Sequence, residues 1–270
     1  MSEKNIKLSH KNEDWQLRLS SGEKGCFAIL DNAYERKSIT TRLSRLAFGY
    51  YENTISPLSE QIPELDHHNI VAETKAILED EPFIIGITGR SGSGKSTLAK
   101  KIEDEYKDDG FRVTVLSTDD YNRGKQEIAK LTGVDHENGE KINWDEHTVY
   151  DIDALHWDLQ RAKIWIPTLG KREFDFASLE TVIDRETFIE PAEIMIVEGI
   201  MANSPILRED IDKHYEIPTP LATCIGRRVM RDTTGRKVSW TAEEILRYQI
   251  EVAEPEYRKR LRLPVVQPAT

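Results

Sequence analysis

The stretch at residues 84–97, IIGITGRSGSGKST, decides the fold. It begins as a short apolar run, typical of a buried strand, and passes through a Gly/Ser-rich turn into a helix-forming segment. Residues 89–96 satisfy the pattern G-x-x-x-x-G-K-[ST], in which glycines let backbone N–H groups converge on a phosphate at a helix N-terminus. The pattern and its context predict a nucleotide site; a strand–helix turn without a ligand is the alternative.

The same pattern assigns roles to individual residues. Lys95 is expected to bridge the β- and γ-phosphates, and the Ser96 hydroxyl is expected to ligate Mg²⁺. The residues expected to bind the nucleotide are Gly89, Ser91, Gly92, Ser93, Gly94, Lys95, Ser96 and Thr97.

The surrounding sequence predicts an α/β fold with a mostly parallel sheet flanked by helices. Apolar runs at residues 83–88, 113–117 and 194–197 predict strands, and helical patterns lie between them. Helices are expected over residues 95–108 and 151–163, and Thr241 and Glu244 fit a capping box that opens another.

The chain is expected to consist of two parts. Residues 81–270 form the predicted nucleotide-binding domain, and residues 1–80 form a helical or irregular extension, with a helix expected at 38–51. Few residues follow the last predicted helix, so the extension is expected to cover an edge of the sheet.

Composition limits the function classes. The net charge of -11, from 48 acidic residues against 37 Lys plus Arg, disfavours a nucleic-acid partner. Neither a secretory signal nor a membrane-length apolar run is visible, and the two cysteines, Cys26 and Cys224, have no metal-ligand spacing. We therefore expect a cytoplasmic protein with free thiols and neither a membrane nor a nucleic-acid partner.

Carboxylates follow two of the predicted strands. In STDDYNR, Asp119 follows an apolar strand and is expected to accept a proton from a substrate hydroxyl or to orient Mg²⁺ through water. Glu198 ends the strand IMIVE and is a second candidate for the metal. A helix cap at Asp119 and an ordinary strand end at Glu198 are the structural alternatives.

A basic run, residues 226–237, contains five cationic side chains within an acidic protein. The helical spacing of Arg227, Arg228 and Arg231 suits a lid whose guanidinium groups neutralise charge on transferring phosphates, and Arg236 is a further lid candidate. A solvated basic helix face is the alternative.

These motifs together resemble the phosphoribulokinase/uridine kinase family. GRSGSGKST, STDDYNR, NWDEHTVYD, IVEGI and RRVMRDTTGR occur in the family's order over residues 81–263, whereas the NKxD motif of GTPases and the LSGGQ motif of transport ATPases are absent from the sequence. The resemblance implies Mg²⁺-assisted transfer of a phosphoryl group from ATP to a small-molecule hydroxyl.

The resemblance also implies site residues. Asp119 would be the base, Lys95 and Arg231 would act on the transferring phosphate, Ser96 and Glu198 would hold Mg²⁺, and Arg227, Arg228 and Arg236 would contact the nucleotide. A set of residues is expected at the acceptor, which is a small hydroxyl compound and in the nearest branch a nucleoside: Asp119, Tyr121, Asp175 and Phe176.

The acceptor segments differ from the family pattern. Glu146 stands where a histidine is usual, Phe174 replaces a tyrosine, and Leu179, Glu180 and Thr181 replace a His-Ser-Arg sequence. Three functions therefore stay open: a uridine/cytidine-type kinase, a pantothenate-kinase-like enzyme, and an ATP-binding regulatory protein with a degenerate acceptor site. Whether the chain forms a homo-oligomer is also open.

Overall fold

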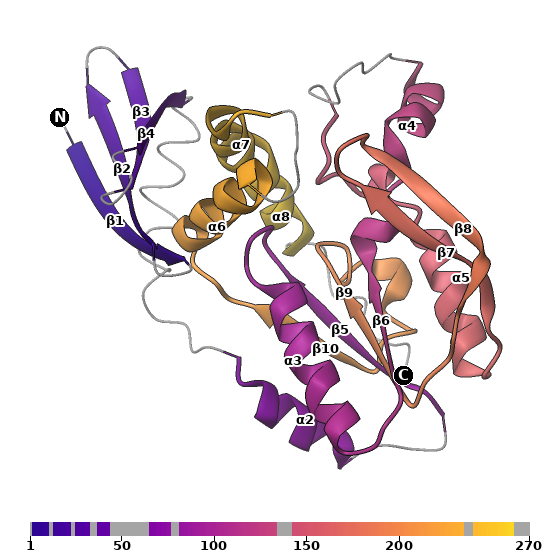
Figure 1. Cartoon of the computed structure of the whole chain (residues 1–270). Helices are drawn as coiled ribbons and strands as arrows, with labels where there is room; N and C mark the ends of the chain where they lie inside the picture. Colours follow the sequence, from indigo (N-terminus) through magenta and orange to yellow (C-terminus); the bar gives the residue numbers. More distant parts are fainter. Residues whose placement is uncertain are drawn as a thin grey trace, which may run out of the picture.

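The structure is a computed structural model, and it describes residues 2–10, 13–22, 25–32, 37–43, 65–76, 81–133, 142–234 and 240–261 (Figure 1). A four-stranded parallel sheet forms the centre, in the order β10-β5-β9-β6. Its strands are β5 (Phe83–Gly89), β6 (Val113–Ser117), β9 (Ile194–Glu198) and β10 (Lys213–Ile217). Three of these were predicted from their apolar runs, and the predicted α/β class is confirmed.

The two inner strands are buried on both faces, which explains why they are continuous apolar runs without alternation. Successive side chains of a strand point to opposite faces. In β9, Ile194 and Ile196 belong to one hydrophobic cluster, while Met195 and Val197 belong to another on the opposite face. Each face therefore needs its own layer of helices.

Helices α2 (His67–Lys75) and α3 (Lys95–Asp108) cover the first face. Helix α3 has the predicted bounds and ends before Asp109 and Gly110. Helix α2 packs on α3 through Ile70 and Val71, which are 2% and 1% exposed. The opposite face is covered mainly by α5 (Ile152–Lys163), which also lies close to its predicted position.

Two further groups of elements surround the carboxyl ends of the strands (Figure 1). One is the antiparallel hairpin of β7 (Thr168–Asp175) and β8 (Glu180–Ile189). The other is helical and consists of α6 (Leu221–Thr234), α7 (Ala242–Tyr248), a π-helical turn (Gln249–Ala253) and α8 (Glu254–Leu261). Short elements complete the described core: η2 (Thr118–Tyr121), α4 (Gly124–Thr132), η3 (His147–Val149) and η4 (Pro205–Leu207).

The predicted capping box of α7 is confirmed. The Thr241 side chain accepts a hydrogen bond from the Glu244 backbone N–H, and the Glu244 carboxylate accepts one from the Thr241 N–H. This reciprocal pair fixes the start of α7 directly after the end of the basic run.

The N-terminal part differs from the helical or irregular extension that the sequence suggested. It contains an antiparallel sheet of β1 (Ser2–His10), β2 (Glu13–Gly22), β3 (Gly25–Asn32) and β4 (Lys37–Leu43), in sequential order. The helix expected at 38–51 is wrong for residues 38–43, because the β-branched run Ile39, Thr40, Thr41 pairs with β3. The rest of that expected helix lies outside the described residues. Strand β1 lies beside α6, and β4 beside α7 (Figure 1).

One edge of the parallel sheet contacts α2. The Tyr215 hydroxyl of β10 donates a hydrogen bond to the Glu73 carboxylate at 3.3 Å, and Lys213 lies 3.7 Å from the same carboxylate. Within the described ranges, no helix combines the length and the apolar character that a membrane crossing requires. The last residues, 262–270, lie outside the described part of the chain.

Candidate active site

The loop between β5 and α3 adopts a conformation that only glycine tolerates at several positions. Gly92 has φ +83°, and a Cβ there would lie 2.3 Å from the carbonyl oxygen of Cys224 in α6. Gly94 has φ +101° and is the N-cap of α3, so it offers the first-turn N–H groups no side-chain acceptor. The loop thus forms a cradle of backbone donors at a helix N-terminus, as anion binding requires.

Side chains from α6 and from the β10–α6 connection hold this cradle. Arg227 donates from Nη1 to the Ser93 carbonyl at 3.3 Å, and the Thr219 hydroxyl donates to the same oxygen at 2.8 Å. Arg231 donates to the Ser91 hydroxyl at 3.4 Å. The Ser93 hydroxyl is buried and lacks a hydrogen-bond partner in the described structure, which leaves it available for a phosphate oxygen.

Lys95 lies beneath the cradle and is 9% exposed. Its ammonium donates to the carbonyls of Gly89 and Arg90 at 3.2 and 3.0 Å. Burial lowers the pKa of Lys95, although the nearby carboxylates of Glu198 and Asp119 oppose this shift. An anion bound above the lysine would favour its charged form.

Ser96 and Glu198 meet at the ends of α3 and β9. The Ser96 hydroxyl donates to Oε1 of Glu198 at 3.0 Å, and burial raises the pKa of Glu198 despite the nearby Lys95. A buried carboxylate beside a hydroxyl is a hard-oxygen ligand set that suits Mg²⁺. The residues present therefore fit the implied metal.

Asp119 and Asp120 follow β6 but face different surroundings. Asp119 lines a cavity together with Lys95, Ser96 and Glu198. Asp120 accepts a hydrogen bond from the backbone N–H of Phe174 at 3.4 Å, and burial raises the pKa of Asp120 to about 6. Only the first of the two carboxylates is available to a ligand in that cavity.

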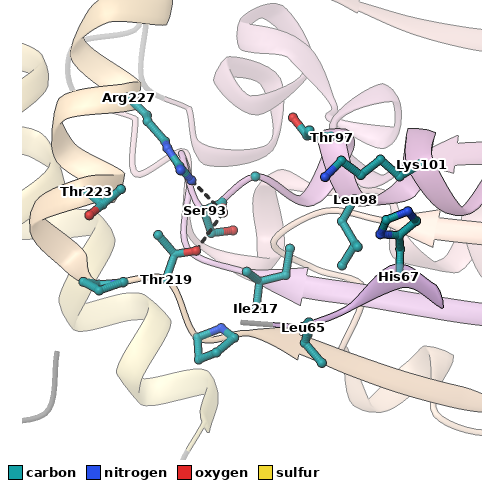
Figure 2. Close-up of a pocket in the computed structure, with 13 residues that line it drawn as sticks. Leu65, His67, Ser93, Thr97, Leu98, Lys101, Ile217, Thr219, Thr223 and Arg227 are labelled. Atoms are coloured by element: carbon teal, nitrogen blue, oxygen red, sulfur yellow. Dashed lines mark hydrogen bonds between the residues drawn. The ribbon is translucent and has the colours of Figure 1, made fainter. Parts of the chain in front are cut away.

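Two cavities adjoin the cradle. The Asp119 cavity measures about 110 Å³ and reaches Ser91, Lys95 and Ser96 of the loop and α3. The His67 cavity measures about 590 Å³ and reaches Ser93, Gly94 and Thr97 (Figure 2). The two cavities share no lining residue, and each borders a different part of the cradle, so a linear phosphate chain lying along the cradle would extend from one cavity towards the other.

The predicted site residues divide between these cavities. Eight of them line the Asp119 cavity: Ser91, Lys95, Ser96, Asp119, Phe176, Glu198, Arg228 and Arg231. Four line the His67 cavity: Ser93, Gly94, Thr97 and Arg227. Gly89 and Gly92 shape the loop, and Arg236 lies outside the described residues.

The structure places Tyr121 and Asp175 away from both cavities. Tyr121 is 1% exposed within the core, where its hydroxyl donates to Asp158 at 2.7 Å. The exposed carboxylate of Asp175 accepts bonds from Ala177 and Ser178 and closes its own turn. Both side chains hydrogen-bond structural partners, and their contact with the acceptor stays a prediction.

Several residues of the Asp119 cavity were missed by the sequence. They come from distant segments and include four aromatic and two acidic side chains: Asn122, Trp144, Asp145, Tyr150, Phe174, Leu179, Ile200, Asp232, Trp240 and Ile245. Tryptophan and histidine side chains are common in such pockets, and the chain has two further candidates near Trp144, namely His147 and Trp165. Of these other two, His147 contacts Ser204 at 3.0 Å and Trp165 packs on Arg112, so neither lines the cavity.

Comparison with known proteins supports the interpretation of the motifs. The phosphoribulokinase/uridine kinase family matches residues 84–264. The uridine kinase of Clostridium perfringens (strain ATCC 13124) is 31% identical over 179 residues, 66% of this chain and 80% of that protein. That of Ligilactobacillus salivarius (strain UCC118) is 31% identical over 159 residues, 58% of this chain and 70% of that protein.

Solved structures show the same fold. A putative fructose transport system kinase from Silicibacter sp. TM1040 superposes with a TM-score of 0.59 at 17% identity, covering 74% of this chain and 97% of that one. D-glycerate 3-kinase from Cryptococcus neoformans has a TM-score of 0.56 at 14% identity, covering 74% and 88%. With two thirds of its sequence matched, the chain belongs to the phosphoribulokinase/uridine kinase family and is an ATP-dependent small-molecule kinase, a phosphotransferase that acts on a hydroxyl group.

Proposed function

We propose that this kinase phosphorylates a hydroxyl of a neutral acceptor, most like the ribose hydroxyl of a pyrimidine nucleoside such as uridine or cytidine. One observation carries the proposal: Lys95, Ser96, Asp119 and Glu198 line a single cavity that five aromatic side chains also line. Phosphate-binding groups, a carboxylate base and a surface for a flat ring thus converge.

The cradle and the lid would hold the donor. Backbone N–H groups of the loop and the Lys95 ammonium would bind the β- and γ-phosphates, with Ser96 and Glu198 as the residues that hold Mg²⁺. When bound, Mg²⁺ neutralises negative charge on the phosphates. Arg231, which already contacts Ser91, would donate to the transferring group.

Asp119 would act on the acceptor. Its carboxylate would accept the proton of the acceptor hydroxyl as the hydroxyl oxygen bonds to the γ-phosphorus. The bond between that phosphorus and the β,γ-bridging oxygen breaks, and ADP carries the electron pair away. Asp119 has the required position because it lines the cavity beside Lys95 and Ser96.

The charge balance of the Asp119 cavity favours a neutral acceptor. Four carboxylates line it, from Asp119, Asp145, Glu198 and Asp232, against three cationic side chains. Two of these cations, Arg228 and Arg231, already pair with Asp232 at 3.4 and 2.7 Å. Few positive charges are left for an acidic acceptor, which disfavours a pantothenate-like compound.

The aromatic wall favours a planar ring. Trp144 and Phe174 lie 5.9 Å apart between ring centroids, and Phe174 and Phe176 lie 5.0 Å apart in an edge-to-face arrangement. Such faces stack on a nucleobase. The buried indole N–H of Trp240, which has no partner within the described part of the chain, would serve as a donor to a base carbonyl.

The small volume of the Asp119 cavity suggests a second candidate for the acceptor. A drug-sized ligand usually occupies roughly 300–1,000 Å³, whereas this cavity measures about 110 Å³. A nucleoside would enter only if α6 and α7 moved away from the hairpin, as lids do in kinases. A sugar-like polyol would need a smaller movement, so the measured volume favours it as the alternative acceptor.

The test is ATP consumption with Mg²⁺ against uridine, cytidine, purine nucleosides, neutral sugars and pantothenate. The full-length protein is compared with Asp119→Asn, and Asp120→Asn is the matched control because its side chain faces the Phe174 backbone. We expect turnover with a pyrimidine nucleoside and a loss of about 10²-fold or more in kcat in Asp119→Asn. The control keeps its turnover.

Other outcomes separate the alternatives. If only a sugar is phosphorylated, the acceptor is the sugar-like polyol and not a nucleoside. Turnover with pantothenate would refute the argument from charge. ATP binding without turnover of any acceptor would support the regulatory protein instead, and near-normal kcat in Asp119→Asn would remove the base from the mechanism.

A further inference from the structure

The His67 cavity contains side chains that the family region does not supply. One side of the cavity is formed by the loop, α3, β10 and α6, all within residues 84–264. The other side includes Leu65 and His67, which lie outside that region (Figure 2). A segment that precedes the matched region therefore borders the phosphate cradle.

The direction of the bound donor follows from the division of the cradle. The γ-phosphate must lie in the Asp119 cavity, because the base Asp119 and Lys95 are there. The nucleoside end of the same linear molecule then leaves the cradle past Ser93, Gly94 and Thr97, into the His67 cavity. At about 590 Å³ this cavity falls within the range that small-molecule sites occupy, and it has room for a purine nucleoside.

The lining of the His67 cavity suits a base and a ribose. Leu65, Leu98 and Ile217 are apolar, and two prolines follow β10. Polar groups of the lining include the Lys101 ammonium and the imidazole of His67 (Figure 2). An apolar slot with a few donors at its edge is the usual form of a base-binding site.

Hydrogen bonds hold α2, which carries His67, in place against α3. Asp66 caps α2 by accepting a hydrogen bond from the His68 N–H at 3.1 Å. Thr74 is fully buried and hydrogen-bonds the Tyr106 hydroxyl of α3. The His67 side chain is 24% exposed and lies 3.9 Å from the Glu105 carboxylate, whereas that of His68 is 68% exposed and lies 2.9 Å from the same carboxylate. Only the first of the two histidines reaches the cavity.

We infer that Leu65 and His67, at the start of α2, form one wall of the donor pocket, where they contact the base of a purine nucleoside triphosphate and set the affinity for the donor. The inference rests on the proposed function for the direction of the nucleotide. It assigns to the kinase site a segment that lies outside the region shared with the family.

The experiment measures binding by calorimetry on the full-length protein with two probes, Mg-ATP and Mg-tripolyphosphate. Tripolyphosphate occupies the cradle but has no base. The variants are His67→Ala and Leu65→Ala, and Glu73→Ala is the matched control because its carboxylate faces Tyr215 on another side of α2. Thermal melting without a nucleotide shows whether each variant is folded.

We expect the Kd for ATP to rise about tenfold in His67→Ala and in Leu65→Ala, since each removes apolar or ring contact from the base. The Kd for tripolyphosphate should stay within twofold in all three variants, and Glu73→Ala should bind ATP like the wild type. An unchanged ATP affinity in folded His67→Ala, or an equal loss for both probes, would overturn the inference.

This result is separable from the proposed function. Binding is measured without an acceptor, so a wild-type protein that binds ATP but turns over nothing would overturn the proposed reaction and leave the wall intact. If instead the wild-type protein turns over a nucleoside and the variants bind ATP normally, the proposed reaction is supported and the inference about the wall of the donor pocket is overturned.

Discussion

At the scale of single residues, the adjacent carboxylates of Asp119 and Asp120 have different surroundings and different roles. Asp119 faces the cavity with Lys95, while Asp120 turns to the hairpin and accepts the N–H of Phe174. Because Asp120 has lost most of its solvent, its pKa is raised to about 6. The second carboxylate thus fixes the hairpin against η2, and it does so at a cost in desolvation.

The raised pKa of Asp120 predicts that the stability of the folded protein depends on pH. The pKa of Asp120 in the folded protein, about 6, lies above the ordinary aspartate value of 3.8, so the folded state binds more protons between these two pH values. Stability from this group therefore falls as pH rises from 3.8 towards 6 and stays at the lower level above that. Asp120→Asn keeps an acceptor for Phe174 and removes the ionisation.

We expect Asp120→Asn to raise the Tm at pH 7 to 8 and to leave the Tm near pH 4 unchanged. The measurement is the difference in Tm between wild type and variant across pH 4 to 8, which cancels the titration of Glu198 and the other carboxylates common to both. A difference that is constant over this range would show that burial of Asp120 does not affect stability in this way.

The sequence predicted residues whose chemistry has a fixed spacing. Lys95, Ser96, Asp119 and Glu198 were found because a loop pattern and strand ends determine where they lie. The surroundings of Tyr121 were not predictable in this way: its ring lies in the core, and its hydroxyl donates to Asp158, 37 residues further along the chain. No local pattern encodes such a partner.

At the scale of elements, α6 connects the lid to the phosphate cradle. Arg227 and Arg231 lie one turn apart on it, and they donate to Ser93 and Ser91 respectively. The predicted lid helix therefore contacts the loop, while residues 235–239 of the basic run lie outside the described part of the chain. Closure of α6 would bring Arg231 onto the transferring phosphate.

Replacement of Arg231 tests this role. Arg231→Gln removes the guanidinium and should lower kcat about 10²-fold, with a smaller effect on the KM for ATP, because the missing charge matters most in the transition state. The matched control is Arg247→Gln on α7, where a half-exposed guanidinium lies 3.8 Å from Glu243. Steady-state kinetics distinguish the two; equal losses in both variants would contradict a specific role for Arg231.

Secondary structure was predictable where one local pattern was decisive. The bounds of α3 and the capping box of α7 follow from short motifs. The wall formed by Trp144, Phe174 and Trp240 does not, because these residues come from three segments that meet only in the folded chain. Strand β4 was missed because a pattern of apolar residues at helical spacing overlapped with its β-branched run.

At the scale of the whole molecule, the first eighty residues contain two different parts. The sheet β1–β4 lies beside α6 and α7, whereas α2 lies on α3 against the central core. The proposed division into residues 1–80 and 81–270 therefore has α2 on its N-terminal side, although α2 buries Ile70 and Val71 in the hydrophobic cluster of the kinase sheet.

Two truncations separate these parts. Removal of residues 1–64 takes away the N-terminal sheet, and removal of residues 1–80 also takes away α2. Full burial of an aliphatic side chain contributes roughly 1.5–3 kcal/mol, so loss of Ile70 and Val71 should cost about 3–6 kcal/mol more in the second truncation. For a domain of this size, that corresponds to a Tm at least about 6 °C lower.

We therefore expect the protein without residues 1–64 to melt close to the wild type in its kinase core and to bind ATP. The protein without residues 1–80 should melt at least about 6 °C lower than the first truncation. It should also bind ATP more weakly, since Leu65 and His67 are gone. Calorimetric melting of both truncations beside the full chain makes the comparison.

Equal melting temperatures of the two truncations would mean that α2 adds nothing to the stability of the core. A collapse already on removal of residues 1–64 would instead show that the core depends on the sheet beside α6 and α7, through which the N-terminal part would then support the lid.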